Sequence, residues 1–267
     1  MSNQLLPTFI IGGSPRSGTT FLGNILGRHP QVRMAQPYIP EPKVFMGPSV
    51  TPEVAKERYR RLFEGSPKIG EKARGEKTSY YLEYELACQR IKTVLPGIKI
   101  VFILREPVSR AYSNYLWTRK NGLETLSFEE ALEFEGKRPN PLPPDKEYAR
   151  PFDYLCRGNY APCVDRYYQA IGREKVLILL YENIEQNPER LCSQLQKFIQ
   201  VDEVPFQTLN PGVINSACES GPPISRELEL KLRIQTAPWV SNLAGLTGLD
   251  LSIWDYEGNT SLGRKSI

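Results

Sequence analysis

Short apolar runs recur along the chain, and three of them predict buried strands. The runs lie at 9–11, 98–104 and 176–180. Each is continuously apolar instead of alternating with polar residues, which is typical of strands that are covered on both faces of a parallel sheet. The pattern therefore indicates central strands of such a sheet.

Helical patterns fill the stretches that follow these strands. Phe21, Leu22, Ile25 and Leu26 share one face of a helix that we expect from about 18 to 28. Capping residues, prolines and apolar spacing predict further helices at 51–65, 107–121 and 188–199. Strands that alternate with helices predict an α/β fold of three layers, a central parallel sheet flanked by helices on both faces.

Two proline-rich stretches interrupt this alternation. We interpret residues 136–151 and 210–223 as long loops near the active site. Loops of this length are often functional lids, although a plain surface excursion explains them equally well. Because the chain shows no internal repeat and no low-complexity linker, we expect a single domain over 1–267.

Composition and charge narrow the class of ligand. The chain carries 34 basic and 30 acidic residues, a net charge of +4, which is too mild for a nucleic-acid binder but suits a pocket for a small polyanion. Its five cysteines form no C-x-x-C pair, so neither a zinc site nor a disulfide framework is indicated. The first eight residues do not resemble a signal peptide and no apolar run could span a bilayer, so we expect a cytoplasmic protein with no membrane partner.

The loop after the first strand, from Gly13 to Thr20, predicts phosphate binding. Its glycines let successive N–H groups face an anion, and the next helix adds the positive end of its dipole. The sequence resembles the P-loop G-x-x-x-x-G-K-[ST], but Thr19 stands where that motif has lysine, and Arg16 supplies a cation inside the loop. The loop alone leaves a P-loop kinase or NTPase as an alternative.

The second anion signal follows the strand at 98–104. P-loop ATPases hold Mg²⁺ with an acid at such a strand end. Here the strand ends in Arg105, a cation. The combination predicts a metal-free site for a nucleoside with phosphates at two separate positions, 5′ and 3′.

These residues resemble the sulfotransferases that use 3′-phosphoadenosine 5′-phosphosulfate, and the match covers most of the chain. The family's P-[KR]-[ST]-G-T-[TS] loop binds the 5′-phosphosulfate, and an arginine at a strand end with a serine eight residues later holds the 3′-phosphate. The resemblance implies a P-loop-like fold, no metal and these donor-binding residues: Pro15, Arg16, Ser17, Gly18, Thr19, Thr20, Arg105 and Ser113.

Two further blocks resemble the catalytic segments of the same family. Glu41-Pro42-Lys43-Val44-Phe45 is similar to K-E-x-H-F-F, whose glutamate is the proposed general base, with Lys43 in place of the histidine. Gly75 to Ser79 is similar to G-x-K-[ST]-P, which implies that Lys77 lies at the transfer centre and that Ser79 replaces the proline. The lone His29 is expected to cap or pack a helix, and it is also the alternative base.

The resemblance implies metal-free in-line sulfuryl transfer to a hydroxyl or amine. Glu41 would act as base, and Arg16 and Lys77 would neutralise developing charge. We expect a small-molecule acceptor, as in natural-product tailoring, and Glu41 with the acids around it, Glu71, Glu76 and Glu83, would tolerate a cationic one. A non-catalytic nucleotide-binding module is the other alternative, and the oligomeric state cannot be predicted.

Overall fold

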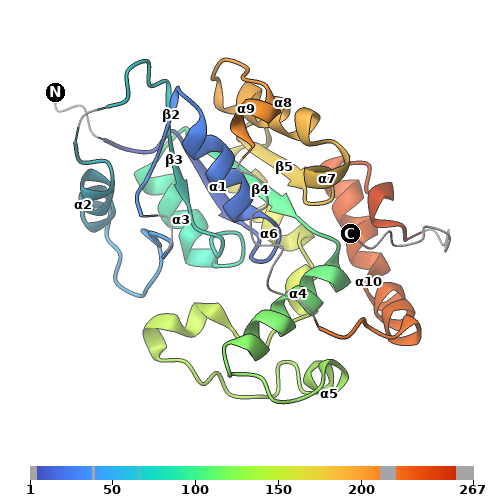
Figure 1. Ribbon diagram of the computed structural model, residues 1–267. Coiled ribbons are helices and arrows are strands. Elements are labelled where there is room, and N and C mark those ends of the chain that lie inside the picture. The colour runs from blue at the N-terminus through green and yellow to red at the C-terminus, as the bar shows by residue number, and fades with distance from the viewer. Residues whose placement is uncertain (1–4, 38–39, 66, 211–220, 257–267) are drawn as a thin grey trace.

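Five parallel strands form the centre of the structure (Figure 1). The computed structural model describes residues 5–37, 40–65, 67–210 and 221–256. The strands lie in the order β2-β3-β1-β4-β5, so the first strand of the chain is the middle one. Their bounds are β1 Phe9–Gly13, β2 Val32–Met34, β3 Ala73–Lys77, β4 Lys99–Leu104 and β5 Val176–Leu180. The three strands expected from apolar runs are confirmed, and β2 and β3 are additional.

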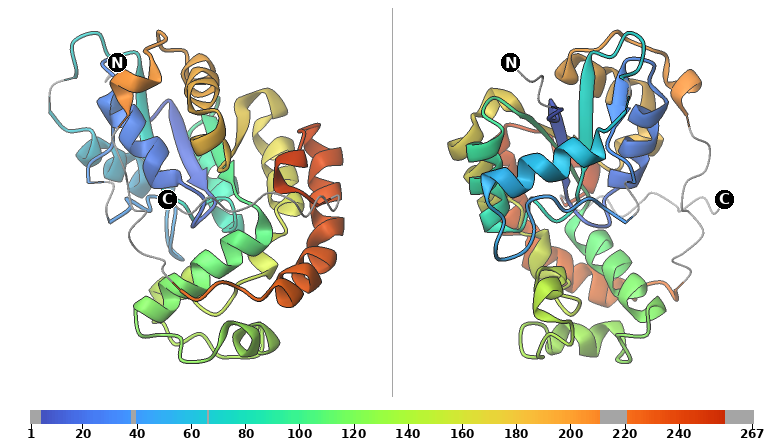
Figure 2. Two further views of the ribbon diagram at one scale, coloured as in Figure 1. Left: turned by 45° about the vertical axis from the view of Figure 1, so that its right-hand side comes forward. Right: turned by 90° about the vertical axis from the view of Figure 1, so that its left-hand side faces the viewer.

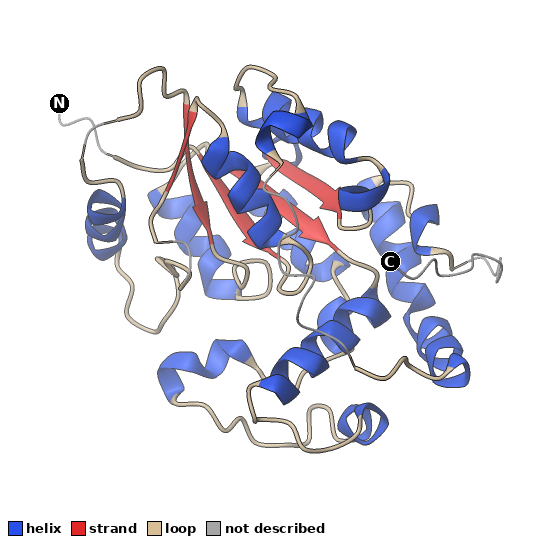
Figure 3. Cartoon of the chain, viewed as in Figure 1, coloured by secondary structure: helices blue, strands red, loops and turns tan. Residues whose placement is uncertain are grey.

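Helices cover both faces of this sheet, as expected (Figures 2 and 3). Side chains alternate between the faces, so Ile11 packs in one core and Ile10 in the other. The face with Ile11 lies against α1 Thr19–Arg28 and α8 Pro188–Ile199, with the short α7 Asn183–Gln186 and α9 Phe206–Leu209 beside them. The other face lies against α2 Pro52–Leu62, α3 Glu85–Val94, α6 Ala161–Ile171 and part of α10 Arg226–Thr247.

A smaller helical layer lies beyond the carboxyl ends of the strands, at the bottom of Figure 1. It contains α4 Pro107–Lys120 and α5 Phe128–Glu133, which share an apolar cluster with Tyr154 and Leu232. Short 3₁₀ helices complete the chain at Pro144–Ala149, Cys156–Gly158, Arg173–Lys175 and Ser252–Trp254. The first of these lies inside the loop expected at 136–151, whereas most of the loop expected at 210–223 is outside the described residues.

Polar residues terminate the strands on the side that faces this layer. In parallel sheets, ligands bind at the carboxyl ends of the strands, where the chain leaves in opposite directions from neighbouring strands. Here β1 leads into α1 on one face, and β4 leads into α4 below the sheet (Figure 1). The segments predicted to bind phosphate are therefore neighbours.

Candidate active site

The loop between β1 and α1 presents an uncapped helix start. Gly18 has φ 90°, in the left-handed region, so a residue with a side chain would be strained there, and its Cβ would also come within 2.7 Å of Ile184 Cδ1. Within the described part of the chain, no side chain caps α1 and its first turn contains no acid. The first N–H groups and the positive dipole end of α1 therefore point toward the strand ends, where an anion can bind them.

Arg16 leaves this loop toward α4. Its backbone also lies in the left-handed region, at φ 68°. Its Nε donates a hydrogen bond to the Ser113 hydroxyl over 3.2 Å. Since Ser113 lies two turns into α4, this bond joins the two segments that sequence reasoning assigned to opposite ends of one nucleotide.

Arg105, directly after β4, lies close to the same point. Its guanidinium stacks 4.4 Å from the centre of the Tyr181 ring and donates to the Arg16 carbonyl over 3.4 Å. The Tyr160 hydroxyl donates to the Arg105 carbonyl over 2.8 Å and fixes the backbone at this turn. A pocket of about 360 Å³ opens here, and its lining includes Arg105, Ser109, Tyr112, Ser113, Leu116 and Gly221.

Glu41 and Lys77 form the other half of the site. Lys77 ends β3, and its Nζ lies 2.8 Å from Glu41 Oε1. The side chain of Lys77 is 3% exposed and that of Glu41 is 15% exposed, so the pair is shielded but still reachable from solvent. The stem of Lys77 packs against α1 at Gly23, where an added Cβ would lie 3.4 Å from it. The structure therefore brings together the two residues that were expected at the transfer centre.

Ser79 connects the two halves, a role that sequence reasoning missed. Its N–H donates to Glu41 Oε2 over 3.1 Å, and its hydroxyl donates to Glu41 Oε1. Because that proton is committed to Glu41, Thr19 must donate the 2.9 Å bond that joins its hydroxyl to Ser79. The signal was present in the sequence: serine has the N–H that proline, the usual residue of the similar motif, lacks.

A sulfotransferase domain family model matches residues 6–210. The chain belongs to the sulfotransferase family. A sulfotransferase from Alicyclobacillus acidocaldarius has a similar structure, with a TM-score of 0.70 and 30% identity over 94% of this chain and 99% of that one. The P-loop-like fold expected from the sequence is thereby confirmed. A mouse sulfotransferase complexed with PAP shares the fold at a TM-score of 0.52 and 18% identity, covering 83% of this chain and 69% of that one.

Curated relatives resemble the sulfotransferase domain over part of their length. The membrane-associated sulfotransferase kil1 of Dictyostelium discoideum is 31% identical over 128 residues, 46% of this chain and 26% of the relative. The bifunctional heparan sulfate N-deacetylase/N-sulfotransferase 1 of Mus musculus is 27% identical over 201 residues, 73% of this chain and 22% of the relative. This chain thus spans about a quarter of the length of these proteins. In the described ranges, no helix is both long and apolar enough to cross a membrane.

Lys43 takes the place of the family's histidine and lies among aromatic rings in this sulfotransferase. Its Nζ is 5.2 Å from the centre of the Tyr148 ring and 5.9 Å from that of Tyr80. Burial lowers the pKa of Lys43, but Tyr148 and Glu41 more than offset this, so the net pKa is raised and the ammonium stays charged. Through Tyr148, the segment 136–151 contacts Lys43 and Tyr80.

The three acids that suggested a cationic acceptor do not form a shared wall in the sulfotransferase domain. Glu71 pairs with Arg74 over 2.9 Å. Glu83 lies 2.9 Å from Arg157 and 2.7 Å from Arg150; burial raises its pKa, and the two arginines lower it below the ordinary value. Glu76 is fully buried. This basis for a cationic acceptor is therefore wrong, because each acid is already bonded or buried.

His29, the alternative base, lies outside this site. It follows the last residue of α1, a helix of ten residues and about 15 Å, whereas the phosphate loop precedes the first. The ring is fully buried; Nδ1 accepts from the Gln31 N–H over 3.1 Å, and Nε2 lies 3.1 Å from Gln196 Oε1 and 3.0 Å from the Asp202 carbonyl. These contacts show that His29 packs against its neighbours. The expectation that it could be the alternative base is wrong.

Proposed function

We propose that this chain moves the sulfuryl group of 3′-phosphoadenosine 5′-phosphosulfate to a hydroxyl or amine of a small-molecule acceptor. The observation that carries the proposal is the Arg16–Ser113 hydrogen bond of 3.2 Å. It brings the phosphate loop within reach of Arg105 and the pocket above α4. A ligand with one phosphate at the loop and another at Arg105 would therefore fit a single continuous site. A triphosphate bound through Mg²⁺ would not use Arg105 in this way.

The donor site divides between backbone and side chains. The 5′-phosphosulfate would lie at the loop, with the N–H groups of the α1 start below it. Arg105 and Ser113 would hold the 3′-phosphate, because a guanidinium fork and a hydroxyl are suited to phosphate oxygens. The residues assigned to the donor are Pro15, Arg16, Ser17, Gly18, Thr19, Thr20, Arg105 and Ser113.

Glu41 would take the proton from the hydroxyl or amine of the acceptor. As it does so, the oxygen or nitrogen of that group attacks sulfur, and the bond from sulfur to the bridging phosphate oxygen breaks. Lys77 is bonded to Glu41 in the structure. It would turn toward the transferring group and neutralise charge there, which also frees a lone pair of Glu41 for the proton. Arg16 cannot give up its proton at useful pH, so it would act as a fixed cation.

The acceptor would enter between Glu41 and the Tyr80–Tyr148 pair, whose rings are 5.2 Å apart. Aromatic walls favour a small organic acceptor of the kind modified in natural-product tailoring. The Lys43 ammonium between these rings and Glu41 favours an uncharged acceptor over a cationic one. A cytoplasmic site of action stays a prediction.

The test is a calorimetric titration with 3′,5′-adenosine bisphosphate in the presence of a metal chelator. We expect binding without metal, weaker binding of 5′-AMP, and no Mg²⁺-dependent ATP turnover. ATP turnover with Mg²⁺ would instead show a P-loop NTPase or kinase. Binding of the bisphosphate without any conversion of the phosphosulfate, across a panel of phenols, alcohols and amines, would favour a non-catalytic nucleotide-binding module.

A further inference from the structure

Glu76 is a buried carboxyl group that the transfer reaction does not use. It lies in β3 next to Lys77, but strand alternation turns its side chain to the opposite face of the sheet. Burial raises its pKa to about 7, although hydrogen bonds from three hydroxyl groups lower it. Around it lie Tyr59 of α2, Tyr81 after β3, Tyr167 of α6 and the more distant Glu41. A charge kept in this apolar core is costly, so its contacts need an explanation.

All three hydroxyl groups donate to this carboxylate. The Tyr59 hydroxyl donates to Oε2 over 2.6 Å. The hydroxyls of Thr78 and Tyr81 both donate to Oε1, over 2.6 and 2.8 Å. In its ionised form, which predominates above pH 7, the carboxylate only accepts; these hydroxyl protons are then fixed, and the oxygens of Thr78 and Tyr81 are left to act as acceptors.

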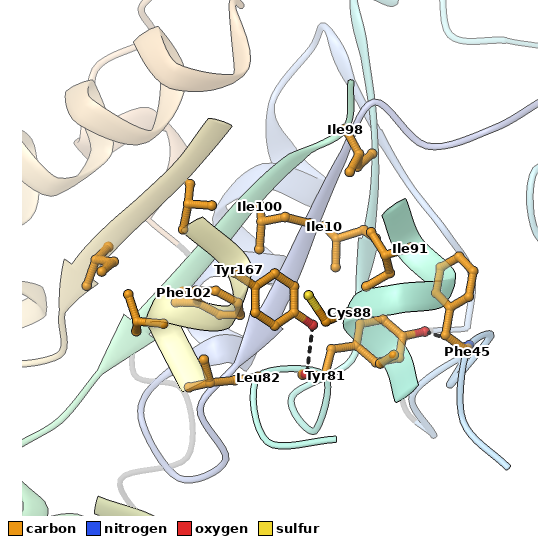
Figure 4. Close-up of a cluster of buried hydrophobic side chains, with 14 of the residues drawn as sticks. Ile10, Phe45, Tyr81, Leu82, Cys88, Ile91, Ile98, Ile100, Phe102 and Tyr167 are labelled. Atoms are coloured by element: carbon orange, nitrogen blue, oxygen red, sulfur yellow. Dashed lines mark hydrogen bonds between the residues drawn. The ribbon is translucent and has the colours of Figure 1, made fainter. Parts of the chain in front are cut away.

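Both of these oxygens accept from the segment that carries Glu41. The Lys43 N–H donates to Thr78 Oγ1 over 3.0 Å, and the Phe45 N–H donates to the Tyr81 hydroxyl over 3.2 Å. Figure 4 shows the second of these bonds, together with the bond from Tyr167 to the Tyr81 carbonyl that holds Tyr81 in place. Lys43 has φ 51°, a backbone conformation that a residue with a side chain keeps only under external restraint.

We propose that Glu76 is a positioning residue that sets the place of Glu41 by orienting two hydroxyl groups toward the backbone of residues 43–45. Lys77, the last residue of β3, and the residues after it then hold this segment in two ways. Lys77 and Ser79 bond the Glu41 carboxylate itself, and Thr78 and Tyr81 bond the backbone two and four residues later. The effect of Glu76 on turnover rests on the base role proposed for Glu41. Its effect on the position of residues 43–45 does not.

Amide hydrogen exchange across residues 41–47 tests the positioning directly. Thr78→Val and Tyr81→Phe each remove the acceptor of one amide while keeping the side-chain shape, so we expect exchange of this segment to rise roughly tenfold, as for one lost hydrogen bond. Tyr59→Phe is the matched control, because the buried Tyr59 hydroxyl donates to the same carboxylate, at Oε2, and not to the backbone of residues 43–45. Exchange that stays protected in Thr78→Val and Tyr81→Phe, or rises equally in Tyr59→Phe, overturns the proposal.

Turnover of the phosphosulfate with p-nitrophenol as probe acceptor separates this inference from the proposed function. A displaced base should lower kcat roughly 10- to 100-fold in Thr78→Val and Tyr81→Phe, with bisphosphate affinity unchanged and Tyr59→Phe like the parent. Glu76→Met, which has similar volume and no acceptor, should combine both exchange effects; if it does not fold, the hydroxyl variants still decide. Raised exchange with unchanged kcat would support the positioning and contradict the base role of Glu41.

Discussion

The donor half and the acceptor half of this site are built in different ways. The donor half rests on backbone, a loop with two residues at positive φ and the uncapped start of α1, joined to α4 by Arg16 and Ser113. The acceptor half rests on side chains, since Glu41 is held by Lys77 and Ser79 from a segment 36 to 38 residues away. We infer that variants of the first half change mainly nucleotide affinity, and variants of the second change mainly turnover.

The largest effect is expected for Glu41→Gln. Removal of the proton acceptor should lower kcat roughly 10²- to 10⁴-fold, the range of general base catalysis, while the affinity for the bisphosphate stays the same. Turnover assays measure kcat, and calorimetry measures the affinity for the bisphosphate. Glu64→Gln, at an exposed carboxylate after α2, is the control. A large loss of nucleotide affinity in Glu41→Gln would contradict the separation of the two halves.

The acceptor half should also give the protein a pH-dependent stability through Glu76. Its pKa of about 7 in the folded protein lies above the ordinary 4.5, so the folded state binds more protons between these values. Stability is therefore full below pH 4.5 and falls as pH rises through 7, by about 3 kcal/mol in total. Chemical unfolding at a series of pH values should show this fall in the parent but not in Glu76→Gln. Parallel curves for the two proteins would contradict it.

The donor half is tested by Arg105→Ala. Loss of a charged hydrogen-bond donor to the 3′-phosphate should weaken bisphosphate binding roughly 10- to 100-fold. Affinity for 5′-AMP, which lacks that phosphate, should change little, and calorimetry with both nucleotides makes the comparison. Arg119→Ala, in the last turn of α4, is the control. An equal loss for both nucleotides would mean that Arg105 supports the loop and not the 3′-phosphate.

The donor half was also the part that sequence reasoning could predict. Apolar runs located β1, β4 and β5, and glycine with a following helix located the phosphate loop. These signals are local, because backbone conformation and burial in this region depend on residues that are adjacent in the chain. Arg105 and Ser113 were paired through the resemblance to the family's strand-end arginine and the serine eight residues later, and the structure places both at one pocket.

Beyond Glu41 and Lys77, the contacts of the acceptor half escaped prediction, because its charges are matched across distant segments. β3 has the sequence Ala-Arg-Gly-Glu-Lys, which looks like an exposed charged stretch. Each charge instead has a partner outside the strand: Arg74 bonds Glu71, Glu76 accepts from buried hydroxyls, and Lys77 bonds Glu41. The spacing of apolar and polar residues along the sequence does not indicate such pairings. The same reason explains why the sequence did not show that Glu71, Glu76 and Glu83 are already bonded or buried.

The smallest effect, and the sharpest test of how separate the halves are, is expected for Ser79→Ala. The Ser79 hydroxyl is the link between Thr19 in the donor loop and Glu41. The variant keeps the N–H that holds Glu41 Oε2 and removes only this link. One lost hydrogen bond corresponds to a fall in kcat of about tenfold or less. Bisphosphate affinity should change by a smaller factor, since the loop keeps its backbone donors.

The measurement is kcat and bisphosphate affinity in Ser79→Ala, Thr19→Val and the double variant. Ser193→Ala, which removes a surface hydroxyl that donates to Glu203, is the control. If the Thr19–Ser79 bond couples the halves, the double variant should lose less than the product of the two single losses, because each single variant already breaks the same bond. Losses that multiply would mean that the donor loop and the base act independently and that their contact is only packing.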